Sequence, residues 1–325
     1  MSQDVQIIQR LIDTGRFNPA EMDEVLSHYQ DHPAIIACKI MTGSKIIRSS
    51  TNDAGEFHEN VARLSYPPVK YARTDRASLK GKPMFYGTVF TSAAIKENAY
   101  PRIFSAMETT DILRDFQKTG RVFTTQSLWL PDRDLHLFAF PFSKRYKHAC
   151  EEVVWQRDVW DSQLSLYWPK HYCEFSEFMG DLIAQENHSC LYDITATTID
   201  YILYHSTAAA DLDGVMYPSV WGDGQGMNIC LKKETVDTSV HFQAASVQYI
   251  EKTVGNGTLI GVAESYLLPD GTLKWTPTAY ALNVLQKAYG VEAMFNRDMI
   301  HFETIKNEYS NISAWEQLLN NLHNK

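Results

Sequence analysis

Three side chains that could act together on a charged substrate stand in separate parts of the sequence. Arg76 begins a loop that leads into an aromatic, β-branched segment, Glu97 follows in a helical segment, and Ser219 comes after a proline at the end of another strand-like segment. A guanidinium makes paired, charge-assisted bonds to phosphate oxygens. A carboxylate stabilises a developing positive charge, and a serine hydroxyl in a loop at a strand end commonly lines a pocket.

Glu97 has two interpretations, which the sequence leaves open. At helical spacing it shares a face with Ala93 and Ala94, which are small enough to let the helix lie close against the preceding strand. A carboxylate on that face points inward and needs a partner or a chemical task. The alternative is an ordinary solvated face formed by residues 96–98.

Tyr86 and Ser219 also stand where a functional and a structural interpretation compete. Tyr86 lies in the middle of the strand predicted over residues 84–90, beside Phe85. Because neighbouring side chains in a strand point to opposite faces, one of these aromatics faces the core and the other faces a cleft or solvent. Ser219 lies just before the glycine-rich run at 222–226, and its structural interpretation is turn chemistry.

Taken together, these segments resemble the RES family, which is named for its arginine, glutamate and serine. The similarity is carried by three segments, residues 76–87, 94–97 and 213–220. The arginine, tyrosine, glutamate and serine of the family pattern fall on Arg76, Tyr86, Glu97 and Ser219. Arg48, in an early strand, resembles the arginine often found at the start of the domain, and about residues 44–235 correspond to it.

RES proteins resemble ADP-ribosyltransferases in fold and consume NAD, and many are toxins of toxin–antitoxin pairs. The resemblance therefore implies NAD as the substrate, cleavage of the nicotinamide–ribose bond by hydrolysis or phosphorolysis, and a cognate antitoxin as a protein partner. Some members are reported as ADP-ribosyl transferases, so transfer of ADP-ribose to a protein or small acceptor is one alternative. A nucleotide-binding module that performs no turnover is another.

The resemblance also implies a role for each matched side chain. Glu97 would stabilise the oxocarbenium-like sugar cation or hold the ribose 2′-hydroxyl, as carboxylates do in glycoside cleavage. Arg76 would hold the pyrophosphate, and Arg48 would make a second phosphate contact. Tyr86 would stack on nicotinamide or its ribose, and Ser219 would bond the nicotinamide ribose or amide. The expected catalytic residues are therefore Arg76, Glu97 and Ser219.

Two His-x-Cys pairs offer a different chemistry. His171 with Cys173, and His188 with Cys190, supply the ligand types that zinc prefers. The single residue between the members of each pair is unlike the spacing of structural zinc sites, so we expect buried cysteines and partly exposed histidines, and no metal. Zinc remains the lesser alternative.

Two further motif interpretations find little support. A Cys–His hydrolase would need an activated thiol, and nothing near Cys150 or His148 marks one. Residues 222–226 contain three glycines, but they lack the GxGxxG spacing and no GK[ST] follows. That segment is therefore expected to be a turn between two strands.

The order of elements predicts an α+β fold, because strands are interrupted by helical blocks without regular βαβ alternation. The resemblance adds the expectation of ADP-ribosyltransferase-like mixed or antiparallel sheets with flanking helices. Strands are predicted at residues 45–48, 84–90, 122–129, 135–138, 214–217, 228–231, 259–262 and 273–275. Three parts are expected: an N-terminal helical hairpin at 1–41, the RES-like catalytic domain at 42–235, and an extension at 236–325 formed by a strand hairpin and helices.

Composition excludes several classes of protein. Of 325 residues, 44% are hydrophobic and 21% are charged, with 30 Lys and Arg against 39 Asp and Glu, which is typical of a folded globular chain. The net charge of −9 argues against a protein that coats nucleic acid. No signal peptide or membrane-spanning run is found, so we expect a cytoplasmic protein that binds no membrane. The helical C-terminal tail is a candidate surface for an antitoxin or for a homodimer.

Overall fold

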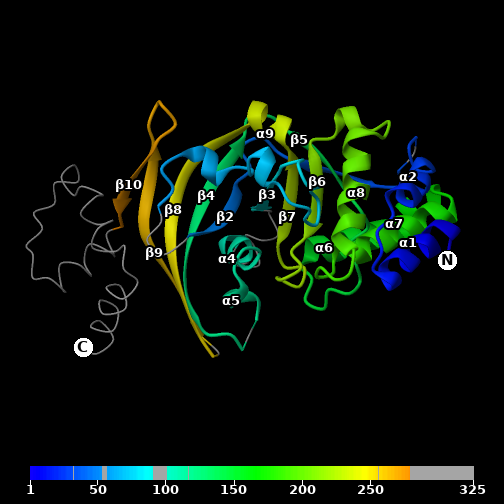
Figure 1. The fold of residues 1–325 in the computed structure, drawn as a ribbon, viewed down its shortest axis with the longest axis horizontal. Coiled ribbons are helices and arrows are strands. Elements are labelled where there is room, and N and C mark those ends of the chain that lie inside the picture. The colour runs from blue at the N-terminus through cyan, green and yellow to red at the C-terminus, as the bar shows by residue number, and fades with distance from the viewer. Residues whose placement is uncertain (32, 53–56, 91–100, 116, 255, 279–325) are drawn as a thin grey trace, which may run out of the picture. The chain divides into compact units, whose positions relative to one another are not determined.

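The structure, a computed structural model, describes the chain except for residues 32, 53–56, 91–100, 116, 255 and 279–325 (Figure 1). The chain divides into two compact units, and each is described by itself. Unit 1 comprises Met1–Ile46, Tyr66–Phe104 and Leu130–His241. Unit 2 comprises Ile47–Ser65, Ser105–Trp129 and Phe242–Lys325.

Ten strands occur among the described residues. They are β1 (Ile36–Ile40), β2 (Ile46–Asn52), β3 (Met84–Val89), β4 (Gly120–Pro131), β5 (Leu135–Ala139), β6 (Gly214–Pro218), β7 (Met227–Lys232), β8 (Val240–Thr253), β9 (Asn256–Leu267) and β10 (Leu273–Pro277).

The described α-helices are α1 (Gln3–Thr14), α2 (Pro19–Ser27), α4 (Pro101–Met107), α5 (Asp111–Arg114), α6 (Glu151–Ser162), α7 (Lys170–Ile183), α8 (Leu191–Tyr204) and α9 (Lys233–Ser239). Short 3-10 helices lie at η1 (Val61–Leu64), η2 (Val69–Tyr71), η3 (Leu164–Tyr167) and η4 (Ala209–Asp211). The predicted α+β class is therefore confirmed, whereas the likeness to ADP-ribosyltransferases stays a prediction.

Unit 1 contains a five-stranded part of the sheet in the order β1-β5-β6-β7-β3. The pair β5–β6 is parallel, and the other three pairs are antiparallel, so the sheet is mixed. In β7 every residue from Met227 to Leu231 is buried, which is typical of an inner strand covered on both faces. Cys230 pairs with Tyr86 on one side and with Val215 on the other, so β7 joins the two strands that carry the matched segments.

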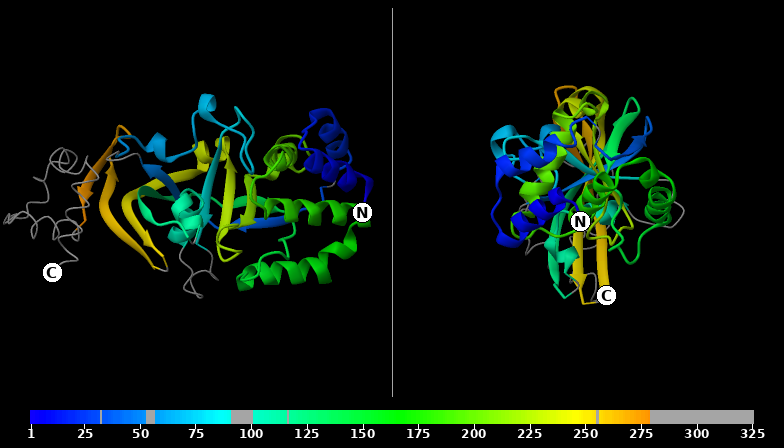
Figure 2. Two further views of the ribbon diagram at one scale, coloured as in Figure 1. Left: turned by 60° about the horizontal axis from the view of Figure 1, so that its bottom comes forward. Right: turned by 90° about the vertical axis from the view of Figure 1, so that its right-hand side faces the viewer.

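Helix α1 ends and helix α2 begins at the capping residues that the sequence predicts. The Asn18 side chain accepts the N–H of Ala20, and Pro19 takes the first helical position of α2. Gly15 ends α1 in the left-handed conformation with φ 65°. Figures 1 and 2 show α1 and α2 packed beside α7 and α8, where their apolar faces form one core that includes Ile8, Met22, Met179 and Ile199.

The chain enters the sheet of unit 1 earlier than the sequence indicated. Residues 36–40, assigned above to the helical hairpin, form β1, which pairs antiparallel with β5 from Ile36↔Ala139 to Ile40↔Leu135. The segment is too short for its periodicity to separate strand from helix, and its pairing partner is about a hundred residues away. The domain boundaries at residues 41 and 235 stay a prediction.

Unit 2 contains strands in the order β2-β4-β8-β9-β10. The predicted hairpin at its end is confirmed: β9 and β10 pair antiparallel, and Asp270 in the connecting turn accepts the N–H of Thr272 at 2.9 Å. Strand β8, which runs beside β9, was not expected from the sequence. The helical tail predicted after residue 279 lies outside the described residues. No helix in the described part of the chain is long and apolar enough to cross a membrane.

Candidate functional site

Arg76 is buried in unit 1, with only 4% of its surface exposed. Its guanidinium donates to the main-chain carbonyl of Ile183, to that of Gln185 at 2.7 Å, and to the hydroxyl of Tyr192 at 3.0 Å. Ile183 is the last residue of α7, where carbonyl oxygens lack helical partners and the helix dipole favours a cation. Arg76 therefore fixes the end of α7 in addition to placing a buried positive charge.

Two tyrosine rings border the same guanidinium. The Cζ atom of Arg76 lies 5.1 Å from the ring centroid of Tyr192 and 5.9 Å from that of Tyr217. Both distances fall within the range of cation–π attraction. Tyr217 belongs to β6 and lies two residues before Ser219. The predicted arginine and the predicted serine segment are thus brought together from distant parts of the chain.

Tyr86 ties its strand to the loop that carries Arg76. Its hydroxyl accepts the N–H of Ala77 at 3.0 Å and donates to the hydroxyl of Ser78 at 3.1 Å. Burial, followed by the nearby Cys230 thiol, raises the pKa of Tyr86 well above its ordinary value. The phenol therefore stays neutral at physiological pH, and its ring packs partly buried against the apolar core of unit 1.

Ser219 opens a closed turn between β6 and β7, here called the Ser219 turn (residues 219–226). Ser219 is fully buried, and its Oγ accepts the N–H of Gly222 at 3.1 Å. Its carbonyl accepts the N–H of Gly224 at 2.9 Å, and its own N–H donates to the carbonyl of Gly226 at 2.6 Å. The expectation of a turn between two strands at 222–226 is confirmed, and because these amides bond within the turn they form no phosphate cradle.

An aromatic ring closes over the Ser219 turn. The ring of Phe104, from α4, lies so close to Gly222 and Gly226 that an added Cβ at either position would meet it at 2.7 Å. A side chain at either position would therefore have to displace the Phe104 ring. Helix α4 therefore packs against the Ser219 turn through Phe104.

Two predicted site residues remain, Glu97 and Arg48. Glu97 lies outside the described residues, so its place and role stay predictions. Arg48 lies in β2, in unit 2, with a half-buried side chain and a main-chain carbonyl that accepts the Ser127 hydroxyl at 3.2 Å. The structure therefore brings together Arg76, Tyr86 and the segment that ends in Ser219.

The two His-x-Cys pairs point to structural roles. Cys173 donates to the carbonyl of Ser165 at 3.4 Å, and Cys190 donates to the carbonyl of Leu11 at 3.3 Å. Burial raises the pKa of both thiols, which disfavours the reactive thiolate. Within the described ranges, no group of three or more His, Cys, Asp or Glu side chains is arranged to hold a metal ion.

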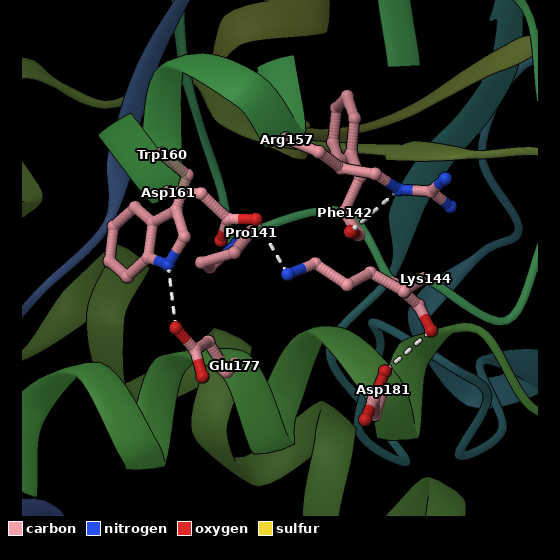
Figure 3. Close-up of a pocket in the computed structure, with 9 residues that line it drawn as sticks. Pro141, Phe142, Lys144, Arg157, Trp160, Asp161, Glu177 and Asp181 are labelled. Atoms are coloured by element: carbon pink, nitrogen blue, oxygen red, sulfur yellow. Dashed lines mark hydrogen bonds and ion pairs between the residues drawn. The ribbon is translucent and has the colours of Figure 1, made fainter. Parts of the chain in front are cut away.

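A separate hollow of about 110 Å³ lies in unit 1 between α6, α7 and the loop after β5 (Figure 3). Lys144 pairs with Asp161 across it at 2.6 Å, and the indole N–H of Trp160 donates to Glu177 at 2.8 Å. None of the predicted site residues lines this hollow. This hollow was not predicted from the sequence.

Several residues around the matched side chains were missed by sequence reasoning. Tyr192 and Tyr217 border Arg76, and Asp223 lies inside the Ser219 turn with φ 50°. Tyr217 stood beside Ser219 in the matched segment, and an aspartate between two glycines is typical of a left-handed turn position. Tyr192 carried no such signal, because its place in a helix says nothing of a loop more than a hundred residues away.

The described geometry of this region comprises a buried cation, two bordering tyrosine rings, a neutral phenol and a serine in a closed turn. No family model matches this chain, and no curated protein matches its sequence.

Proposed function

We propose that this chain is an NAD-consuming enzyme that cleaves the bond between nicotinamide and ribose. The C1′–N bond breaks and nicotinamide leaves with the electron pair. An oxygen of water, which releases a proton to solvent, or of phosphate bonds to C1′. The observation that carries the proposal is the position of the Arg76 guanidinium, 5.9 Å from the ring of Tyr217 in the segment that ends in Ser219. In the resemblance to the RES family, these are two of the three segments that define the site.

The strand register supports the same grouping. Tyr86 and Val215 both pair with Cys230 of β7, so the two matched strands lie on either side of one inner strand. The Tyr86 hydroxyl bonds residues 77 and 78, directly after Arg76. Residues that are separated by more than a hundred positions in the sequence are thereby grouped around β7.

In this proposal Arg76 acts on the pyrophosphate through its fixed positive charge. The carbonyl groups of Ile183 and Gln185 and the Tyr192 hydroxyl hold the guanidinium rigid, so little reorganisation is needed when an anion arrives. A buried cation attracts an anion more strongly than an exposed one, because the surrounding dielectric is lower.

The remaining roles follow the resemblance. Glu97 stabilises the oxocarbenium-like transition state, either directly or through the ribose 2′-hydroxyl. Ser219 bonds the nicotinamide ribose or amide, and Tyr86 forms part of the wall on which the ring stacks. The proposal extends to a cytoplasmic toxin of a toxin–antitoxin pair, with a cognate antitoxin as its partner and homodimer formation as a second association.

The test is incubation of the purified full chain with NAD, with and without phosphate, followed by chromatography and mass spectrometry. Free ADP-ribose indicates hydrolysis, a phosphorylated ADP-ribose that forms only with phosphate indicates phosphorolysis, and a covalently modified acceptor indicates ADP-ribosyl transfer. If calorimetry shows that NAD binds but no nicotinamide is released, the chain is a nucleotide-binding module and not an enzyme. If the chain neither binds NAD nor releases nicotinamide, the proposal is overturned.

A further inference from the structure

A second loop forms hydrogen bonds and packing contacts with the Ser219 turn. This loop, residues 142–150, connects β5 to α6 and is called the bracing loop here. The hydroxyl of Tyr146 donates to the carbonyl of Pro218 at 3.3 Å, directly before the turn begins. A Cβ at Gly224 would lie 3.0 Å from the Tyr146 side chain, so loop and turn are in direct contact.

Asp223 makes the charged link between the turn and the bracing loop. One carboxylate oxygen accepts the N–H of Lys147 at 3.0 Å, and the other accepts the N–H of His148 at 3.0 Å. Hydrogen bonds to an ionised acceptor are stronger than bonds between neutral groups. The backbone of Asp223 has φ 50°, which residues other than glycine rarely adopt. Such a conformation persists only where the surroundings hold it in place.

The bracing loop is itself anchored on two helices, as Figure 3 shows for Arg157 of α6. The Arg157 Nε donates to the carbonyl of Phe142 at 3.1 Å, and the Phe142 N–H donates to the side chain of Gln156 at 3.1 Å. The hydroxyl of Ser143 donates to the carboxylate of Asp181 on α7. The loop is therefore bonded to α6 and α7 at its start and to Asp223 near its end.

We propose that Asp223 is a positioning residue that fixes the direction of the Ser219 hydroxyl. Its two chain neighbours, Gly222 and Gly224, donate to the Oγ and the carbonyl of Ser219. A change in the conformation of Asp223 therefore alters both bonds to Ser219. The inference rests on the proposed function, in which Ser219 contacts the substrate.

The first test compares Asp223→Gly and Asp223→Asn in nicotinamide release from NAD. Glycine accepts φ 50° without strain, so the glycine variant removes the carboxylate without forcing the backbone out of its left-handed conformation. Any Asp→Gly exchange also adds backbone freedom, which is why the control is a second Asp→Gly variant. Because a displacement of about 1 Å can cost roughly a hundredfold in rate, we expect Asp223→Gly to lower kcat by at least about tenfold, with KM changed less than about threefold. Asparagine tolerates the left-handed region and keeps one acceptor oxygen, so Asp223→Asn recovers part of the loss.

The matched control is Asp270→Gly, which removes a carboxylate that also accepts a main-chain N–H in a turn, at 2.9 Å, but in unit 2. Its kcat stays within about twofold of the wild type, since it lies outside the proposed site. A loss of thermal stability in Asp223→Gly with an unchanged kcat for the folded protein identifies a merely structural residue and overturns the proposal.

A double variant decides whether Asp223 acts through Ser219. In a Ser219→Ala background there is no hydroxyl left to direct, so Asp223→Gly should cause no further loss of kcat. A further loss as large as that in the wild-type background contradicts the proposal, because Asp223 would then act by another route.

Hydrogen exchange separates this inference from the proposed function. A wild type that releases no nicotinamide overturns the proposed function, whereas exchange of the Gly222 and Gly224 amides reports on the turn directly. We expect Asp223→Gly to exchange these amides at least about tenfold faster than the wild type and Asp270→Gly to leave them unchanged. Equal exchange rates in the wild type and Asp223→Gly overturn the inference, whatever the activity.

Discussion

Arg133 and Asp213 form a doubly hydrogen-bonded ion pair at the start of β6. The guanidinium Nη1 lies 2.8 Å from one carboxylate oxygen of Asp213, and Nη2 lies 2.6 Å from the other. The same carboxylate accepts the His136 N–H at 2.8 Å and the Thr235 hydroxyl at 2.9 Å. The aspartate that opens the matched segment at 213–220 therefore fixes the start of the strand that leads to Ser219.

The first prediction concerns acid stability. Burial raises the pKa of Asp213, but the bonds from Arg133, His136 and Thr235 outweigh it, and the pKa is lowered from its ordinary value. A lowered pKa contributes stability above the unfolded-state pKa of about 4, and this contribution is lost as the pH falls through the folded-state pKa. Asp213→Asn should therefore lower the free energy of unfolding by about 2 kcal/mol at neutral pH.

Urea unfolding at pH 7 and at the lowest pH that preserves the fold measures this effect. The difference between wild type and Asp213→Asn should shrink at the acidic pH. The control is Asp132→Asn, because Asp132 is the residue next to Arg133 in the sequence and its side chain is 52% exposed. This substitution should lower the free energy of unfolding by less than about 1 kcal/mol. A difference that is equal at both pH values contradicts the role assigned to the Asp213 charge.

The second prediction concerns the close approach of β6 and β7. A Cβ at Gly214 would lie 2.2 Å from the main-chain oxygen of Cys230, so Gly214→Ala forces the two strands apart. The expected cost is about 1–3 kcal/mol in the free energy of unfolding. Gly261→Ala in β9 is the control, because its nearest neighbouring atom lies at 3.6 Å. Equal stability of the two variants in urea unfolding contradicts this packing.

The third prediction concerns the end of α7. A lysine ammonium lacks the planar fork with which Arg76 reaches the carbonyls of Ile183 and Gln185 and the Tyr192 hydroxyl. Arg76→Lys should lower the free energy of unfolding by about 2 kcal/mol, since it leaves buried acceptors without donors. The same exchange at exposed Arg16 is the control. Thermal melts that place both variants at the wild-type midpoint refute the structural role of Arg76.

The fourth prediction concerns the Tyr86 hydroxyl. Tyr86→Phe leaves the buried N–H of Ala77 without its acceptor and removes a donor to Ser78. The expected loss in the free energy of unfolding is about 1–3 kcal/mol. Tyr71→Phe removes a hydroxyl from a residue that is 63% exposed and should change stability by less than about 0.5 kcal/mol. Chemical unfolding of both variants gives the comparison, and a Tyr86→Phe protein as stable as the wild type rules out this link.

Local signals in the sequence predicted much of the fold. The Asn18 cap, the left-handed Gly15 and the turn at residue 270 act within a few residues, so their outcome follows from local chemistry. Strand β1 was missed because it is short and its partner β5 lies about a hundred residues away, whereas β8 was missed although it pairs with β9, the next strand along the chain. In β8 the burial pattern is irregular rather than alternating, which leaves no period to detect.

The candidate site could be predicted only in part. The sequence singled out Arg76, but the carbonyl of Ile183 that it contacts is 107 positions away, and no local pattern connects the two. Asp213 and Gly214 belong to a segment that resembles the RES pattern, whereas their contacts with Arg133 and Cys230 show that they stabilise the start of β6. The role of Glu97 stays a prediction, because that residue lies outside the described part of the chain.

The most direct test of the central claim is nicotinamide release from NAD by the wild type, Glu97→Gln and Glu24→Gln. Glu24 is exposed on α2, so Glu24→Gln is the control: it removes one carboxylate, as Glu97→Gln does, at a position outside the proposed site. Removing a group that stabilises transition-state charge should cost about a hundredfold or more in rate. The account predicts that the wild type and Glu24→Gln release nicotinamide while folded Glu97→Gln does so at least about a hundredfold more slowly. Equal turnover in all three proteins, or none in the wild type, would contradict it.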